Sequence, residues 1–125
     1  MSSKSNNNPE RNLIFSTIDP QGRVVTLTTA TWDHIKEHPE IKRAGLQTVK
    51  KTVVDPFYIV YNEPRSSLIY TNYTNSGLFI NVIAKTDNDL TGASISTSHL
   101  TQKILKGEVI WHKPQKQKKK RKKLK

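Results

Sequence analysis

The chain has 125 residues, of which 34% are hydrophobic, and this length allows one domain with its tails. It contains no cysteine, which excludes a disulfide framework and a thiolate metal site. Its formal net charge of +11 at pH 7 favours a polyanionic partner.

The positive charge is concentrated at the C-terminal end. Nine of the 21 Lys and Arg lie in residues 113–125, which contain no Asp or Glu, so the rest of the chain has twelve basic and ten acidic residues. We predict a disordered polybasic tail that binds nucleic acid, with RNA the expected partner of the protein, by releasing condensed counterions; the tail alone does not distinguish RNA from DNA or another polyanion, and a localisation signal or a solubilising segment is the alternative. Its basic residues are Lys113, Lys116, Lys118, Lys119, Lys120, Arg121, Lys122, Lys123 and Lys125.

The opposite end of the chain is polar. Residues 1–12 have no apolar residue after Met1 and are predicted to be a disordered leader, which leaves residues 13–112 as the folded domain. No apolar segment resembles a signal peptide or is long enough to cross a bilayer. We therefore expect a cytoplasmic protein with no membrane partner.

The N-terminal half predicts a hairpin followed by two helices. The hairpin pairs residues 13–18 with residues 23–28 across the turn Asp19-Pro20-Gln21-Gly22. Thr29 or Thr31 is expected to cap a short helix that runs through His38 and ends at Pro39. Apolar residues at helical spacing predict a second helix over residues 41–54.

The C-terminal half predicts strands over residues 57–61, 67–73, 78–85 and 92–98, joined as a meander. A short helix is expected over residues 100–105, with residues 109–111 packing back on the body. The expected fold class is therefore α+β, with an N-terminal hairpin and two short helices packed on a four-stranded antiparallel sheet.

His34 and His38 stand four residues apart and would share one face of the first helix. They can be interpreted as solvated surface side chains. Alternatively, His-x-x-Glu-His is a zinc-peptidase pattern, with a third ligand to be found among Glu63, Glu108 and His99. A third interpretation is metal-independent acid–base chemistry on RNA.

Cleavage of RNA through its 2′-hydroxyl requires a base, an acid and a cation at the phosphate. Histidine suits both proton-transfer roles, and arginine suits the phosphate because its guanidinium donates two parallel hydrogen bonds. The residues that could supply this chemistry are His34, His38, Arg65 and Lys85, with the hydroxyl groups of Tyr70, Thr97 and Ser98. Strict alternation in residues 93–98 would place Ser98, rather than Thr97, on the open face of the sheet.

The stretch Thr31-Trp32-Asp33-His34-Ile35, followed by His38-Pro39-Glu40, resembles a phage-associated group within the barnase/EndoU/colicin/RelE-like nuclease superfamily. The similar part extends from about residue 24 to residue 111, with Val54-Asp55-Pro56, Arg65, Tyr70, residues 78–85 and Ser96-Thr97-Ser98 in matching order.

This resemblance implies a metal-independent ribonuclease of the toxin or mobile-element type. His34 and His38 would be the acid–base pair and Arg65 the phosphate contact, with Tyr70, Thr97 and Ser98 in auxiliary roles. Lys85 and the tail would bind RNA, no metal or other cofactor would be needed, and a cognate inhibitor protein would be a second partner. The alternative is a non-catalytic RNA- or DNA-binding protein with the same fold.

Overall fold

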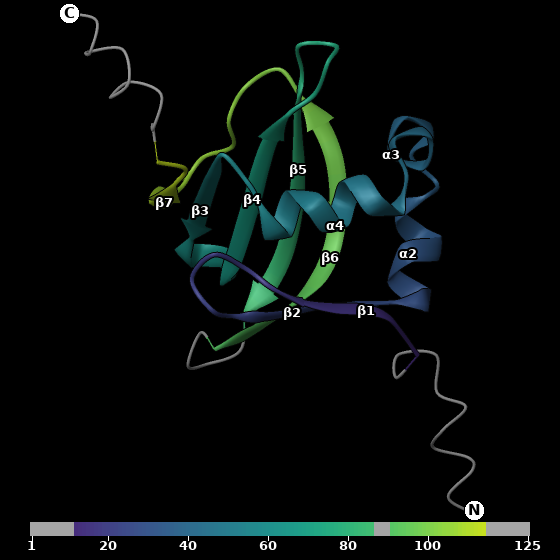
Figure 1. The fold of residues 1–125 in the computed structure, drawn as a ribbon, viewed down its shortest axis with the longest axis horizontal. Coiled ribbons are helices and arrows are strands. Elements are labelled where there is room, and N and C mark those ends of the chain that lie inside the picture. Colours follow the sequence, from purple (N-terminus) through teal and green to yellow (C-terminus); the bar gives the residue numbers. More distant parts are fainter. Residues whose placement is uncertain (1–11, 87–90, 115–125) are drawn as a thin grey trace, which may run out of the picture.

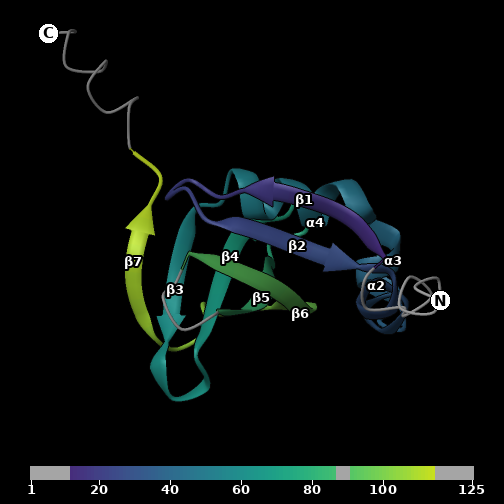
Figure 2. The same ribbon diagram turned by 90° about the horizontal axis from the view of Figure 1, so that it is seen from below.

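The computed structural model describes residues 12–86 and 91–114, and its main feature is one mixed β-sheet (Figure 1). Seven strands follow the order β1-β2-β6-β5-β4-β3-β7. They are β1 (Leu13–Ile18), β2 (Val24–Thr28), β3 (Tyr58–Asn62), β4 (Ser67–Tyr73), β5 (Phe79–Thr86), β6 (Gly92–Thr101) and β7 (Glu108–His112). The sheet is strongly twisted, and β3 and β7 run across the direction of β1 and β2 (Figure 2).

The predicted four-stranded antiparallel sheet is wrong, because the sheet is larger and mixed. The N-terminal hairpin forms as β1 and β2, but it joins the sheet through parallel pairing of Val24–Thr26 with Gly92–Ser94. At the opposite side, β7 pairs antiparallel with β3. Both additions satisfy backbone groups that would otherwise be unpaired at the edges of a hairpin and a smaller sheet.

Three α-helices replace the two that were predicted: α2 (Thr29–Ile35), α3 (Pro39–Ala44) and α4 (Leu46–Val54). The N-cap of α2 is Thr28, whose hydroxyl accepts a hydrogen bond from Thr31 N at 3.3 Å. Pro39 begins α3 instead of ending α2, and a proline suits this position because the first helical N–H has no partner within the helix. Gly45, with a φ of 92°, separates α3 from α4.

The helix predicted over residues 100–105 is absent from the described structure, because β6 continues to Thr101 and an irregular connection covers residues 102–107. A short 3₁₀ turn, η2 (Glu63–Arg65), joins β3 to β4. Most of the predicted leader and tail lies outside the described residues, and Asn12, Lys113 and Pro114 are the parts of them that are described.

The hydrophobic core lies between one face of the sheet and the helices. Helix α4 crosses this face, whereas α2 and α3 lie beside β6 (Figure 1). Fully buried side chains come from both layers, including Leu27, Ile35, Val49, Val53 and Val82. Within residues 12–86 and 91–114, no helix is both long and apolar enough to cross a membrane.

Candidate functional site

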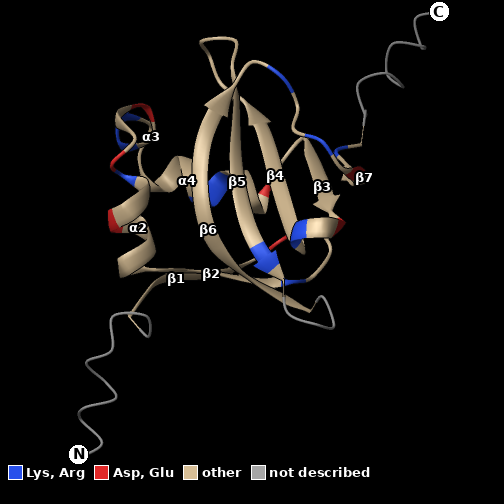
Figure 3. Ribbon diagram, turned by 180° about the vertical axis from the view of Figure 1, so that it is seen from behind, with Lys and Arg blue, Asp and Glu red and all other residues tan. Residues whose placement is uncertain are grey.

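A cavity of about 360 Å³ opens on the sheet face that faces away from α4. Ile69 of β4 and Ile83 of β5 are paired in register and line this cavity. Their neighbours Tyr70 and Val82 belong to the core, and successive strand residues point to opposite faces. Figure 3 shows this face, where no α-helix lies over β4, β5 or β6. We call this site the open-face cavity.

The lining of the open-face cavity is polar and cationic around an apolar floor. Ile69 and Ile83 of the sheet form the floor, Leu105 of the β6–β7 connection is the third apolar lining residue, and no acidic side chain is among the described residues that line the cavity. The polar lining consists of Asn62, Arg65, Ser67, Lys85, Ser96, Thr97, His99 and Lys106. This combination suits an anionic ligand that presents several acceptor oxygens.

Arg65 reaches the cavity because hydrogen bonds hold η2 against β5. Asn62 Oδ1 accepts from Arg65 N at 3.3 Å and caps this turn. The Arg65 carbonyl oxygen accepts from Lys85 Nζ at 3.2 Å and from Ser67 Oγ at 3.0 Å. Lys85 therefore places its ammonium group beside η2, and both Arg65 and Lys85 line the cavity.

Thr97 lines the cavity because a β-bulge reverses the alternation of β6. The register between β5 and β6 shifts between Ile83 and Ala84, which pair with Thr97 and Ile95. Ser96 is the extra residue in β6, so Thr97 turns to the open face and Ser98 to the core. Ser98 is fully buried and donates a hydrogen bond to the Asn81 carbonyl oxygen at 2.8 Å. Ser98 therefore does not line the cavity, contrary to the alternation argument.

His99 is the cavity histidine, and the sequence argument treated it solely as a metal ligand. It pairs with Asn81 across β5 and β6 and is half-buried. Burial lowers the pKa of His99 below its ordinary value, and electrostatic repulsion from the His38 side chain lowers it further, while Glu40 opposes the shift. The shift favours the neutral form of the imidazole, which can accept a proton.

His34 and His38 do not share a helix face. Helix α2 ends at Ile35, and His38 is the N-cap of α3. The His34 side chain is 64% exposed, with Nδ1 3.8 Å from Glu37 Oε1. Neither histidine lines the open-face cavity, although His38 is near enough to influence His99 electrostatically.

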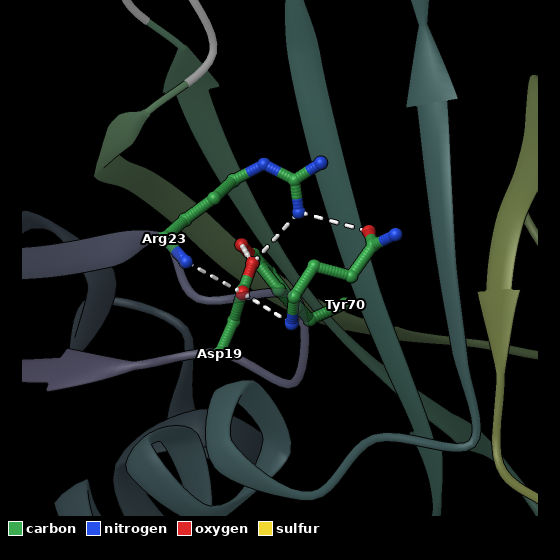
Figure 4. Close-up of polar contacts among 4 residues, drawn as sticks. Asp19, Arg23 and Tyr70 are labelled. Atoms are coloured by element: carbon green, nitrogen blue, oxygen red, sulfur yellow. Dashed lines mark hydrogen bonds and ion pairs between the residues drawn. The ribbon is translucent and has the colours of Figure 1, made fainter.

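Tyr70 points into the core, away from the cavity. Its hydroxyl donates a hydrogen bond of 2.6 Å to Asp19 Oδ2, and Arg23 Nη1 donates to the same carboxylate oxygen at 2.9 Å (Figure 4). Burial and the Asp19 carboxylate raise the pKa of Tyr70. This network connects the turn of the β1–β2 hairpin to β4, which is a structural role.

The binding residues predicted in the tail fall mostly outside the described part of the chain. Lys113 is described, and its Nζ lies 3.1 Å from Asp55 Oδ1 and 5.0 Å from the centroid of the Phe57 ring. Its backbone N–H donates to the Phe57 carbonyl oxygen at 2.9 Å, so Lys113 is attached to the body. Lys116, Lys118, Lys119, Lys120, Arg121, Lys122, Lys123 and Lys125 lie outside the described residues.

The zinc interpretation required three ligands in one place. The described residues contain no group of three His, Asp or Glu side chains in an arrangement that could hold a metal ion. The His-x-x-Glu-His segment also spans the end of α2 and the start of α3, so its two histidines lack the helical geometry that this motif uses.

No protein-family model, curated protein or solved structure matches this chain. The geometry of the open-face cavity is therefore the basis for a functional proposal.

Proposed function

We propose that this protein is a metal-independent ribonuclease whose active site is the open-face cavity. The observation that carries the proposal is the lining itself: Arg65, Lys85 and Lys106 surround the cavity with positive charge, and His99 has a lowered pKa. A phosphodiester supplies the negative charge and the acceptor oxygens that such a lining favours. A neutral imidazole supplies the base that the RNA 2′-hydroxyl requires.

The reaction assigned to this site is an intramolecular transesterification. His99 removes the proton from the 2′-hydroxyl, and the 2′-oxygen attacks the adjacent phosphorus. The bond from phosphorus to the 5′-oxygen breaks, and Lys85 or Lys106 donates a proton to that leaving oxygen. Arg65 stabilises the negative charge that increases on the phosphoryl oxygens. The products are a 2′,3′-cyclic phosphate and a free 5′-hydroxyl.

Cleavage of labelled RNA in the presence of EDTA tests this proposal. A general base contributes about 10²- to 10⁴-fold, so His99→Gln should reduce the cleavage rate by that factor. His34→Gln is the matched control, because His34 is an exposed histidine away from the cavity, and its rate should equal that of the wild type. Equal loss in both variants would contradict the assignment of the active site.

A non-catalytic RNA-binding role is the second candidate. It is favoured by one observation, which is that His99 is the single histidine among the described residues lining the cavity. In that case the wild-type protein would leave RNA intact, while Arg65→Gln would still weaken binding in a gel-shift assay. RNA that is bound but never cleaved would replace the ribonuclease proposal with this one.

A further inference from the structure

An exposed aromatic cluster lies at one end of β4 and β5. The ring centroids of Tyr73 and Phe79 are 4.7 Å apart in a stacked arrangement, and those of Tyr73 and Phe57 are 5.0 Å apart, edge to face. Tyr73 nevertheless has an exposed fraction of 54%. The three aromatic rings are in contact, and the middle ring, Tyr73, is half exposed to solvent, so part of an apolar ring is available to a partner. We call these three residues the aromatic cluster.

Two members of the aromatic cluster, Tyr73 and Phe79, lie on the same face of the sheet as the open-face cavity, with the buried pair Thr71 and Asn81 between them. Tyr73 and Phe79 are directly paired, and the register of β4 and β5 runs without a shift from this pair to Ile69 and Ile83. Tyr73 is four residues from Ile69 in β4, and Phe79 is four residues from Ile83 in β5. Because this spacing is even, the side chains point to the same face of the sheet. At about 3.3 Å per residue, the cluster lies about 13 Å along the strands from the cavity floor.

One cationic side chain, Lys113, lies beside the aromatic cluster and is also paired with Asp55, and other cations line the cavity. The ammonium group of Lys113 lies over the Phe57 ring, at the start of the most basic segment of the sequence. The β6–β7 connection carries exposed Lys103 and Lys106, and Lys106 also lines the cavity (Figure 3). An occupant of the cluster should therefore combine flat apolar groups with a polyanionic backbone.

We propose that the aromatic cluster is a base-stacking subsite for single-stranded RNA. This inference rests on the proposed function. One phosphodiester of the RNA occupies the open-face cavity, and a base from another nucleotide of the same RNA stacks on the aromatic cluster. Unpaired bases expose their flat faces and stack on aromatic side chains, whereas paired bases in a duplex do not. The substrate is accordingly an unpaired segment that extends beyond the cleaved bond.

The first test uses the wild-type protein and NMR. A 2′-O-methyl oligonucleotide, which cannot be cleaved through its 2′-oxygen, should shift the ring resonances of Tyr73 and Phe79 upfield by stacking. Inorganic polyphosphate has the charge but no bases, and it should leave these resonances unchanged. Ring resonances that do not respond to the oligonucleotide, or that respond to protein concentration instead, would overturn the proposal; the latter would indicate contact with a second copy.

The second test compares affinities for a long oligonucleotide and for a dinucleotide. Stacking of one base contributes about 1–3 kcal/mol, so Tyr73→Ala should weaken binding of the long oligonucleotide by about 5- to 160-fold. Tyr73→Phe keeps the ring and should retain the wild-type affinity. Neither variant should change binding of the dinucleotide, which reaches only the cavity, and thermal melting verifies that each variant is folded.

These outcomes separate the subsite from the active site. Loss of cleavage in His99→Gln with no effect of Tyr73→Ala would overturn the stacking subsite alone. Weaker binding in Tyr73→Ala, with no cleavage by the wild type, would support the subsite and contradict the ribonuclease proposal.

Discussion

The proposed chemistry depends on the state of one side chain, His99, in a cavity lined by cations. Its pKa is lowered mainly by burial and secondly by His38, and Glu40 acts in the opposite direction. An ordinary histidine has a pKa of about 6.5, so a lowered value keeps the base form available in mildly acidic solution. The acidic limb of the pH profile for kcat/KM should reflect this group.

Two substitutions should move the His99 pKa in opposite directions. Glu40→Gln removes the charge that raises the pKa, so it should lower the value further. His38→Gln removes the side chain whose electrostatic repulsion lowers the pKa, so it should raise the value. NMR titration of the His99 imidazole measures both shifts without relying on activity. Shifts with the same sign, or none in either variant, would contradict the electrostatic account.

The sequence identified part of the cavity at the level of single residues. Arg65, Lys85 and Thr97 were candidates, and the structure places all three in the cavity lining. His99 was not assigned to acid–base chemistry, because the His34/His38 pair offered a stronger local pattern. Ser98 was preferred over Thr97 because a β-bulge has no clear signal in the sequence, and one inserted residue reverses the facing of every later side chain.

At the scale of elements, the local pairings were predictable and the distant one was not. The hairpin turn at residues 19–22 and the turn at residues 75–77 have strong sequence signals, and the antiparallel pairs β1–β2 and β4–β5 are confirmed. The parallel pairing of β2 with β6 joins residues more than 60 positions apart, and no local sequence pattern predicts it. The break at Gly45 depends on a positive φ, which a single glycine in a helical pattern does not reveal.

The docking of the N-terminal hairpin depends on the buried contact between Asp19 and Tyr70. A hydrogen bond to a charged group contributes about 1.5–3 kcal/mol, so Tyr70→Phe should lower the free energy of unfolding by about that amount at pH 7. Tyr58→Phe is a suitable control, because the Tyr58 hydroxyl has no hydrogen-bond partner in residues 12–86 and 91–114, and it should change stability by less than about 0.5 kcal/mol.

The Tyr70 contribution should also depend on pH. The folded-state pKa is raised, so the stabilisation is complete below the unfolded-state pKa of about 10 and is lost as the pH rises above it. The difference between wild type and Tyr70→Phe in urea unfolding should therefore narrow in alkaline solution. A difference that stays constant above pH 10 would show that the hydroxyl is not held in its neutral form.

At the scale of the whole molecule, charge is divided between a nearly neutral body and a basic C-terminal segment. Residues 115–125 contain eight Lys and Arg and no acidic residue. The body concentrates a few of its own cations around the open-face cavity. The two features make separate contributions, because the segment should provide affinity for any RNA and the cavity should position one phosphodiester.

Removal of residues 115–125 tests this division and leaves Lys113 in its contact with Asp55. The slope of log Kd against log salt for a long RNA should become shallower, by about 0.7 for each phosphate contact that is lost. Cleavage of a dinucleotide should keep its wild-type rate. An unchanged salt dependence would show that this segment does not contact the RNA.

The central claim is that an RNA phosphodiester binds in the open-face cavity. Its most direct test is NMR mapping of a bound 2′-O-methyl oligonucleotide on the wild-type protein. We expect the largest chemical-shift changes at Arg65, Lys85, Thr97 and His99, with no change at His34. Changes centred on His34 and the α2–α3 surface, with the cavity residues unaffected, would contradict the account.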